Sequence, residues 1–182
     1  MSAALAPTKD PLMTKRAAIL TALFIALIWA ANYATNRWGF VTLGPWAFTA
    51  GTYAAGLSFG VRDALHEVAG RRLVVVAIAI GAAFSAFLSP ALALASGAAF
   101  LFGESADLAI YLPLRRRHWA GAVVASNLAG AVVDTVLFLW IASYANIPGL
   151  NLNWDTFTGQ MVGKALMILP ALVLVGWLRR RR

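Results

Sequence analysis

Two ionisable residues interrupt long apolar segments of the chain. Asp134 stands in the apolar run 119–143, and Lys164 stands in the run 156–178. Both lie about seven or eight residues from the polar connection between these runs, so at about 1.5 Å per residue they share a depth of roughly 10–12 Å. A charge in hydrocarbon needs a partner or a cavity. They therefore predict a buried ion pair that fixes helix register, a polar substrate site, or both.

Two carboxylates stand three residues apart in a further apolar segment. Glu104 and Asp107 would share one face of a helix there. Such a pair can bind a cation, share a proton, or accept hydrogen bonds from the donors of a ligand. The alternative is a helix that starts late, which would leave both residues in a hydrated break.

Side-chain amides extend this polar set to further segments. We expect polar groups to point inward from at least four helices, because amides as well as charges avoid lipid. A hydrated central cavity is the structure that accommodates them. The amides are Asn32 and Asn36, four residues apart; Asn127, seven residues before Asp134; and Gln160, one helical turn before Lys164.

Three aromatic residues lie deeper than the tryptophans that mark segment ends. Phe48, Tyr53 and Phe59 belong to the second apolar run. A planar ligand would need such a ring or an apolar slot. If the ligand is planar, one of these three rings can stack on it.

A charged stretch ends the second apolar run. Arg62, Asp63 and Glu67 are followed by Gly70, a plausible helix stop. The simplest interpretation is a solvated helix end. The functional alternative assigns these three residues to gating or anchoring on the cytoplasmic side.

Catalytic and metal chemistry find little support. The chain has no cysteine and two histidines, which is too few for a histidine metal centre. It has no HExxH motif, no phosphate loop and no nucleophile elbow. We therefore expect no enzyme activity, no cofactor and no metal.

The composition requires lipid as a solvent. Of the 182 residues, 61% are hydrophobic and 12% are charged, against about a quarter charged in soluble domains. A helix needs about 20 residues to cross the bilayer core. The apolar runs predict an all-α polytopic protein with six spans, with a break at Ser89-Pro90. We expect a flexible cytoplasmic tail at 1–16, a membrane domain at 17–178 and a basic cytoplasmic end at 179–182.

Basic residues segregate to alternate connections. Thirteen of the fifteen would lie inside if the N-terminus is cytoplasmic, which places both termini there. The net charge of +8 is thus an orientation signal rather than a sign of nucleic-acid binding. Only Arg37 would lie outside, and Lys164 lies within a span.

Short motifs along the chain resemble those of one family. Asp63, Glu67 and Gly70 resemble the aspartate–x3–glutamate–x2–glycine signature of the queuosine-precursor transporters, also called the VUT or vitamin uptake transporter family. The ordered set covers roughly residues 25–175. It also includes Asn32 with Asn36-Arg37, Glu104 with Asp107 and Tyr111, Asn127 with Asp134-Thr135 and Phe138, and Lys164 with Pro170.

The resemblance implies uptake of a 7-deazaguanine base, the cyano or aminomethyl form, across the bacterial inner membrane. It does not decide between proton coupling and facilitated diffusion, and it leaves open whether the protein forms a homodimer. One alternative is the substrate-binding subunit of an energy-coupled vitamin importer, which would need an ATPase partner. Another is a membrane protein without transport activity. The substrate site would comprise Asn32, Asn36, Phe48, Tyr53, Glu104, Asp107, Asn127, Asp134, Gln160 and Lys164.

Overall fold

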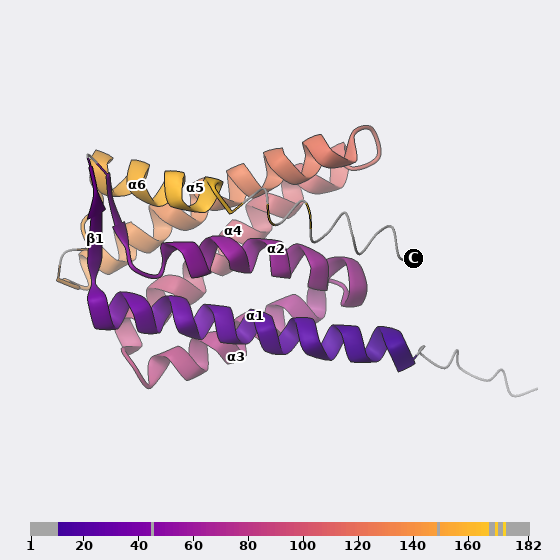
Figure 1. The fold of residues 1–182 in the computed structure, drawn as a ribbon, viewed down its shortest axis with the longest axis horizontal. Helices are drawn as coiled ribbons and strands as arrows, with labels where there is room; N and C mark the ends of the chain where they lie inside the picture. Colours follow the sequence, from indigo (N-terminus) through magenta and orange to yellow (C-terminus); the bar gives the residue numbers. More distant parts are fainter. Residues whose placement is uncertain (1–10, 45, 149, 168–169, 171–172, 174–182) are drawn as a thin grey trace, which may run out of the picture.

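The described residues form six helices and one β-hairpin, and the long helices run along the long axis of the bundle (Figure 1). The computed structural model describes residues 11–44, 46–148, 150–167, 170 and 173. The elements are α1 (Pro11–Trp38), β1 (Phe40–Leu43), β2 (Trp46–Thr49), α2 (Thr52–Ala69), α3 (Arg71–Ala86), α4 (Pro90–Leu114), α5 (Trp119–Tyr144) and α6 (Trp154–Ala165).

Three of these helices are long and apolar enough to cross a membrane by themselves. Within the described residues they are Thr14–Trp38, Pro90–Leu114 and Trp119–Tyr144. The helix α3 has only 16 residues, and α2 contains Arg62, Asp63 and Glu67. The expected class, a mostly helical membrane protein, is confirmed, whereas six spans and the placement of the termini remain predictions.

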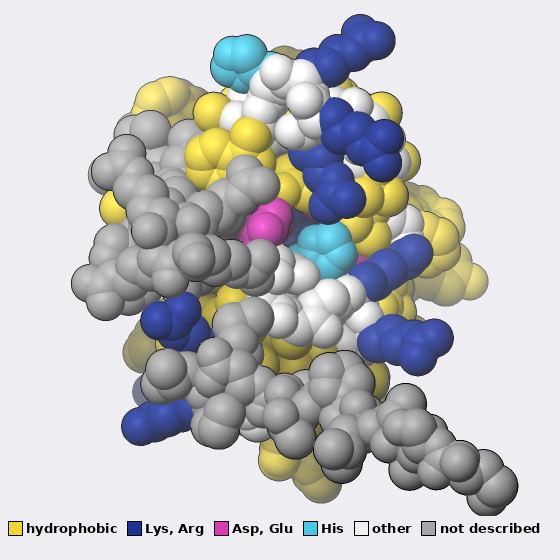
Figure 2. All heavy atoms as spheres, turned by 90° about the vertical axis from the view of Figure 1, so that its right-hand side faces the viewer, with side chains coloured by type: hydrophobic (Ala, Val, Ile, Leu, Met, Phe, Trp, Pro, Cys, Tyr) yellow, Lys and Arg dark blue, Asp and Glu magenta, His cyan; other side chains and the backbone are white. Residues whose placement is uncertain are grey.

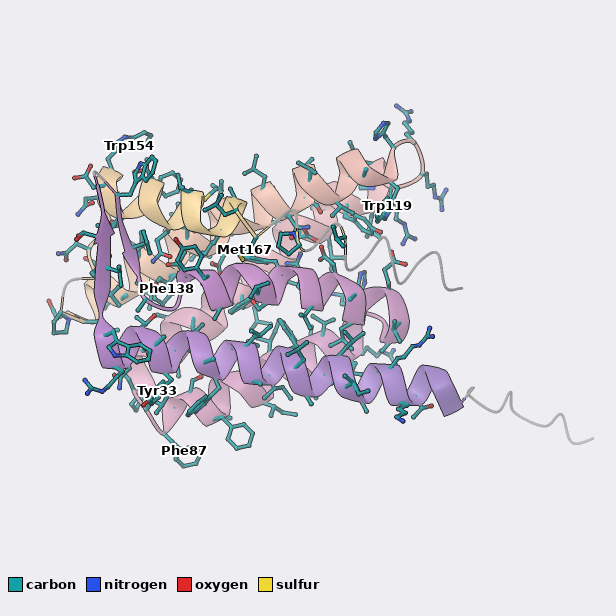
Figure 3. All side chains as sticks on the ribbon, in the orientation of Figure 1. Tyr33, Phe87, Trp119, Phe138, Trp154 and Met167 are labelled. Carbon is teal, nitrogen blue, oxygen red and sulfur yellow. The ribbon has the colours of Figure 1, made fainter. Side chains whose placement is uncertain are left out.

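The outer surface of the bundle suits lipid. Phe87 and Leu94 are exposed, as are Phe102 and Trp140. Tyr33 and Phe87 point away from the bundle, whereas Trp119 and Trp154 lie at its opposite ends (Figure 3). Tryptophans favour the two membrane–water interfaces, so this arrangement agrees with a bundle whose long axis crosses the membrane.

The β-hairpin corrects one expectation. An all-α chain was expected, but β1 and β2 pair antiparallel at the start of the second apolar run, with Phe40 opposite Thr49. β-branched and aromatic residues fit a strand as well as an apolar helix, and Gly44 takes a left-handed φ of +59° at the turn. The helix α2 therefore begins only at Thr52.

Two element ends also differ from the expected domain limits. The helix α1 starts at Pro11, inside the stretch 1–16 that was expected to be a tail, and proline is well tolerated in a first helical turn. Residues 1–10 and the basic end at 179–182 lie outside the described residues. The last helix was expected over 156–178, and it is described continuously to Ala165.

The predicted break at Ser89-Pro90 is confirmed. The helix α3 ends at Ala86 and α4 begins at Pro90, where a missing N–H costs nothing. The Ser89 hydroxyl accepts a hydrogen bond from the backbone N–H of Leu92 at 3.2 Å, which caps the new helix.

Three glycines allow close contacts of α6 with its neighbours. A Cβ on Gly56 would lie 2.8 Å from the side chain of Met167, and one on Gly163 would lie 2.6 Å from Thr52. A Cβ on Gly159 would overlap the carbonyl oxygen of Ala47 in β2. These three glycines hold α6 against α2 and the hairpin.

Basic side chains gather at one end of the bundle (Figure 2). The start of α1, the α2–α3 connection and the α4–α5 connection all lie at this end (Figure 1). They carry Lys15 with Arg16, Arg71 with Arg72, and Arg115 to Arg117. We call it the basic end, and the predicted topology would make it cytoplasmic.

Candidate substrate site

A small, partly open cavity with polar side chains in its wall lies inside the bundle. The centre of a water molecule can reach about 30 Å³ of it. That is room for about two waters. The walls come from α1, the hairpin, α2, α4, α5 and α6, and they consist of Ile28, Ala31, Asn32, Thr35, Thr49, Gly51, Ala55, Ser96, Phe100, Asp134, Phe138, Gln160 and Lys164.

The ion pair in this wall joins α5 to α6. The Lys164 ammonium donates to Asp134 Oδ2 and, over 2.8 Å, to the hydroxyl of Thr135. Both charged side chains are buried. The matching depths of Asp134 and Lys164 in the sequence predicted their proximity. No hydrogen bond among the described residues uses the second Asp134 oxygen, which remains an acceptor for a ligand.

Gln160 ties α6 to the start of α2. The Thr52 hydroxyl donates to Gln160 Oε1 over 2.6 Å, and Gln160 Nε2 donates to the Thr49 hydroxyl over 3.3 Å. The Thr49 and Thr52 hydroxyls are 2.9 Å apart. The glutamine was expected at the site, whereas the two threonines were not, because threonines are common in apolar segments.

Asn32 connects α1 to α3 and α4. Its amide nitrogen donates to the hydroxyls of Ser85 and Ser96, both over 2.9 Å. Within the described part of the chain its carbonyl oxygen makes no hydrogen bond. Asn32 and Asp134 both line the cavity, so this oxygen and the second oxygen of Asp134 are two acceptors in its wall.

Some expected site residues do not line this cavity. Asn36 is exposed, and Thr35 takes the inward position one residue earlier. Tyr53 is 37% exposed, and its ring meets that of Phe48 edge-on at 5.5 Å. Phe48 is buried, but it contacts Tyr53 rather than the cavity. The rings in the cavity wall are Phe100 and Phe138.

A second polar cluster surrounds Arg62, which is 1% exposed. The Nε of Arg62 lies 3.0 Å from Glu104 Oε2, and its Nη2 lies 3.1 Å from Asp107 Oδ1. The same nitrogen lies 2.7 Å from Asp63 Oδ1. Asn127 Nδ2 donates to the other Asp63 oxygen over 2.7 Å. We call these five residues the Arg62 network.

The Arg62 network corrects two interpretations. Glu104 and Asp107 do share a helical face, but they pair with Arg62 and do not line the cavity. Arg62 and Asp63 were interpreted most simply as a solvated helix end, and that is wrong because both are largely buried. Glu67, one turn further, is half-buried and accepts a hydrogen bond from the Tyr111 hydroxyl over 2.7 Å.

Phe59 lies between the cavity and the Arg62 network. Its ring centre is 5.0 Å from the Arg62 guanidinium carbon and 6.0 Å from Lys164 Nζ. It also packs on Phe100 at 5.8 Å. The sequence indicated only that Phe59 lies deep in an apolar run. Its position between the cavity and the network depends on the rotation of α2 and was not predicted.

These features define a class of protein. An apolar helix bundle that encloses a polar cavity, with charges paired inside it, is the architecture of a membrane carrier for small molecules. The family agrees: residues 86–178 match the profile described as putative vitamin uptake transporter, and the chain belongs to that family. The match covers α4, α5 and α6. No curated protein and no solved structure matches the chain.

Proposed function

We propose that this protein imports a 7-deazaguanine precursor of queuosine, and that the cavity is its binding site. The observation that carries the proposal is the convergence of Asn32, Asp134, Gln160 and Lys164 on one cavity inside the bundle. The family supplies the transport activity. The substrate is inferred from the resemblance and from the chemistry of these side chains.

The polar groups of the cavity complement a guanine-like edge. Such an edge presents a ring N–H beside an exocyclic amino group, so it needs neighbouring acceptors. The unused oxygens of Asp134 and Asn32 are such acceptors, and a carboxylate accepts donors more strongly than a neutral group does. Lys164 can donate to the carbonyl oxygen of the base. Phe100 and Phe138 offer apolar walls for the flat ring.

The cavity must widen before a base can enter. Room for about two waters is too little for a bicyclic ring, so the cavity cannot hold the base in this conformation. The hairpin and α6 meet through the backbone contact at Gly159 and Ala47. Separation of these two elements would open the end of the bundle opposite the basic end, the end that the predicted topology places outside.

The charge balance of the cavity favours a neutral ligand. Asp134 is the only acid that the described residues contribute to its wall, and Lys164 already neutralises it. Glu104 and Asp107 are engaged by Arg62. We therefore expect the 7-cyano form to bind more tightly than the cationic 7-aminomethyl form. Titration calorimetry of the purified protein with both bases measures this order, and tighter binding of the aminomethyl form would contradict it.

The test of the function is rescue of queuosine-modified tRNA in a strain that requires external precursor. Wild type should rescue, and Asp134→Asn should not, because the substitution removes a carboxylate that both holds Lys164 and accepts from the base. The matched control is Asp155→Asn, an exposed acid at the start of α6. Failure of wild type to rescue, at normal membrane abundance, would refute the proposed substrate.

Uptake by the purified protein in liposomes separates the proposal from its rival. An energy-coupled importer subunit would need an ATPase, so it would show no uptake alone. Exchange of labelled base across the liposome membrane without any ATPase supports a self-sufficient carrier. Copurification with an ATPase, together with ATP-dependent uptake, would refute the self-sufficient carrier and favour the energy-coupled importer subunit.

A further inference from the structure

The Arg62 network holds more acids than bases. One guanidinium faces the carboxylates of Asp63, Glu104 and Asp107, whose side chains are 15%, 3% and 6% exposed. Asn127 contributes no charge. If all three acids were ionised, the network would carry two uncompensated negative charges in a region of low dielectric, where isolated charges are strongly disfavoured.

Nearby charges do not restore the balance. Lys164 pairs with Asp134 on the other side of Phe59. On the side of the basic end, Glu67 adds a further acid, bonded to Tyr111, whose ring lies 5.8 Å from the guanidinium of Arg115. His66 is half-buried on α2. Within the described residues, Arg62 is the one base in ion-pair contact with the three carboxylates.

Hydrogen bonding inside the network is incomplete. Glu104 Oε2 and Asp107 Oδ1 are buried and touch Arg62 without forming a hydrogen bond, and Arg62 Nη1 is buried without a partner among the described residues. A proton on Glu104 or Asp107 would convert an acceptor-only carboxylate into a group with one donor. It would also remove one of the surplus charges.

We propose that the Arg62 network is a proton-binding site that couples substrate import to proton entry. The substrate part rests on the proposed function, whereas the proton part rests on the charges of the network. The proton adds to a carboxylate oxygen of Glu104 or Asp107 from water on the outer side. It leaves to water at the basic end.

One carboxylate of the network reaches the surface, and the network adjoins the cavity. Asp63 is partly exposed, and acidic side chains are visible among the basic ones at the basic end (Figure 2). On the cavity side, α4 and α5 touch at two glycines: a Cβ on Gly103 would lie 3.1 Å from Asp134 Cβ, and one on Gly130 would lie 3.3 Å from Asp107 Cβ. The two sites are therefore neighbours on the same helix pair.

A proton fits this site better than a metal ion. The guanidinium already stands where a bound cation would sit, and Ca²⁺ or Mg²⁺ needs about six oxygen ligands. The part of the chain that the structure describes has no group of three or more acids or histidines placed to hold a metal. A protonated carboxyl needs no such set.

Infrared difference spectroscopy tests proton binding without any substrate. At neutral pH the purified protein should show the carbonyl band of a protonated carboxyl. Glu104→Gln or Asp107→Asn should remove or shift this band, and Asp155→Asn should leave it unchanged. A spectrum of wild type with no protonated-carboxyl band at neutral pH would overturn the proposal, whatever the substrate is.

Transport in liposomes tests coupling. Exchange of labelled 7-cyano base, which needs no gradient, first establishes transport. An inside-alkaline gradient of one pH unit, with the membrane potential clamped, should then drive up to about tenfold accumulation for one coupled proton. Glu104→Gln should keep exchange and lose accumulation.

The outcomes distinguish the two proposals. Exchange without accumulation, or accumulation driven by a sodium gradient instead, would refute proton coupling and leave the proposed function standing. No exchange, with the infrared band present and sensitive to Glu104→Gln, would refute the proposed substrate and leave the proton site standing.

Discussion

The Asp134–Lys164 pair allows a quantitative test of whether these charges hold the fold or meet a ligand. Asp134→Leu leaves a buried ammonium whose described partner is the Thr135 hydroxyl alone. Lys164→Met leaves a buried carboxylate without its cation. Removing one member of a buried pair costs about 3–5 kcal/mol of unfolding free energy. Each single variant should lose that amount.

The double variant should behave differently. Replacing both members by apolar residues of similar size removes the uncompensated charge, and such replacements are often neutral or stabilising by about 1–4 kcal/mol. If the two losses were independent, the double variant would lose about 6–10 kcal/mol. We expect it to unfold with a free energy close to that of wild type, and to show no substrate exchange, because both ligand-facing charges are gone.

The assay is unfolding in mixed detergent micelles, followed by circular dichroism, for wild type, both single variants and the double variant. The double-mutant cycle isolates the interaction between the two side chains. Asp155→Asn, which changes an exposed acid on α6, the helix of Lys164, is the control. If both single variants lost less than about 1 kcal/mol of unfolding free energy, the pair would behave like an exposed ion pair. That result would refute the burial of Asp134 and Lys164. A stable double variant that still exchanges substrate would refute the role of the pair in binding.

Two further predictions separate inward from outward positions. Asn32→Ala should lower the unfolding free energy by about 1–3 kcal/mol and weaken binding of the base, because two buried hydroxyls lose their partner. Asn36→Ala changes an exposed position. It should change neither the unfolding free energy nor the affinity measured by calorimetry. Gly159→Ala should lower the thermal midpoint strongly, because the added methyl overlaps the carbonyl oxygen of Ala47, whereas Gly97→Ala, whose Cβ would lie 3.2 Å from the Ala82 Cβ, should shift it little. Equal effects within either pair would contradict the packing described above.

Apolar length and charge placement were enough to predict most of the helices. Runs of apolar residues between charged clusters give α4 and α5 nearly to the residue and α1 except for its first turns, and Ser89-Pro90 gives the α3–α4 break. The hairpin was not predictable in this way. Its residues are apolar, aromatic and β-branched, and such a short stretch satisfies helix and strand patterns equally.

The partners of the charged residues were harder to predict than their burial. Asp134 and Lys164 share a depth that can be counted along the chain, so their pairing followed from the sequence. Arg62 stands at the end of an apolar run, where arginine usually marks the cytoplasmic side. Its burial against Glu104 depends on the rotation of α2 and its packing on α4, which spacing along one helix does not encode. The same limit explains why Thr35 rather than Asn36 faces the cavity.

The two polar sites share their helices, and this would give the proposed proton binding a direct mechanical route to the proposed substrate site. The helix α2 carries Thr52, which bonds the cavity residue Gln160, and Arg62 ten residues later, about 15 Å along a rigid helix. When Glu104 or Asp107 takes a proton, the ion pairs that hold α2 against α4 weaken. Any resulting shift of α2 must then move Thr52, which holds the cavity residue Gln160. Conversely, a base that displaces Gln160 would move Thr52 and alter the contacts of Arg62, and linkage requires that the two effects be equal in free energy.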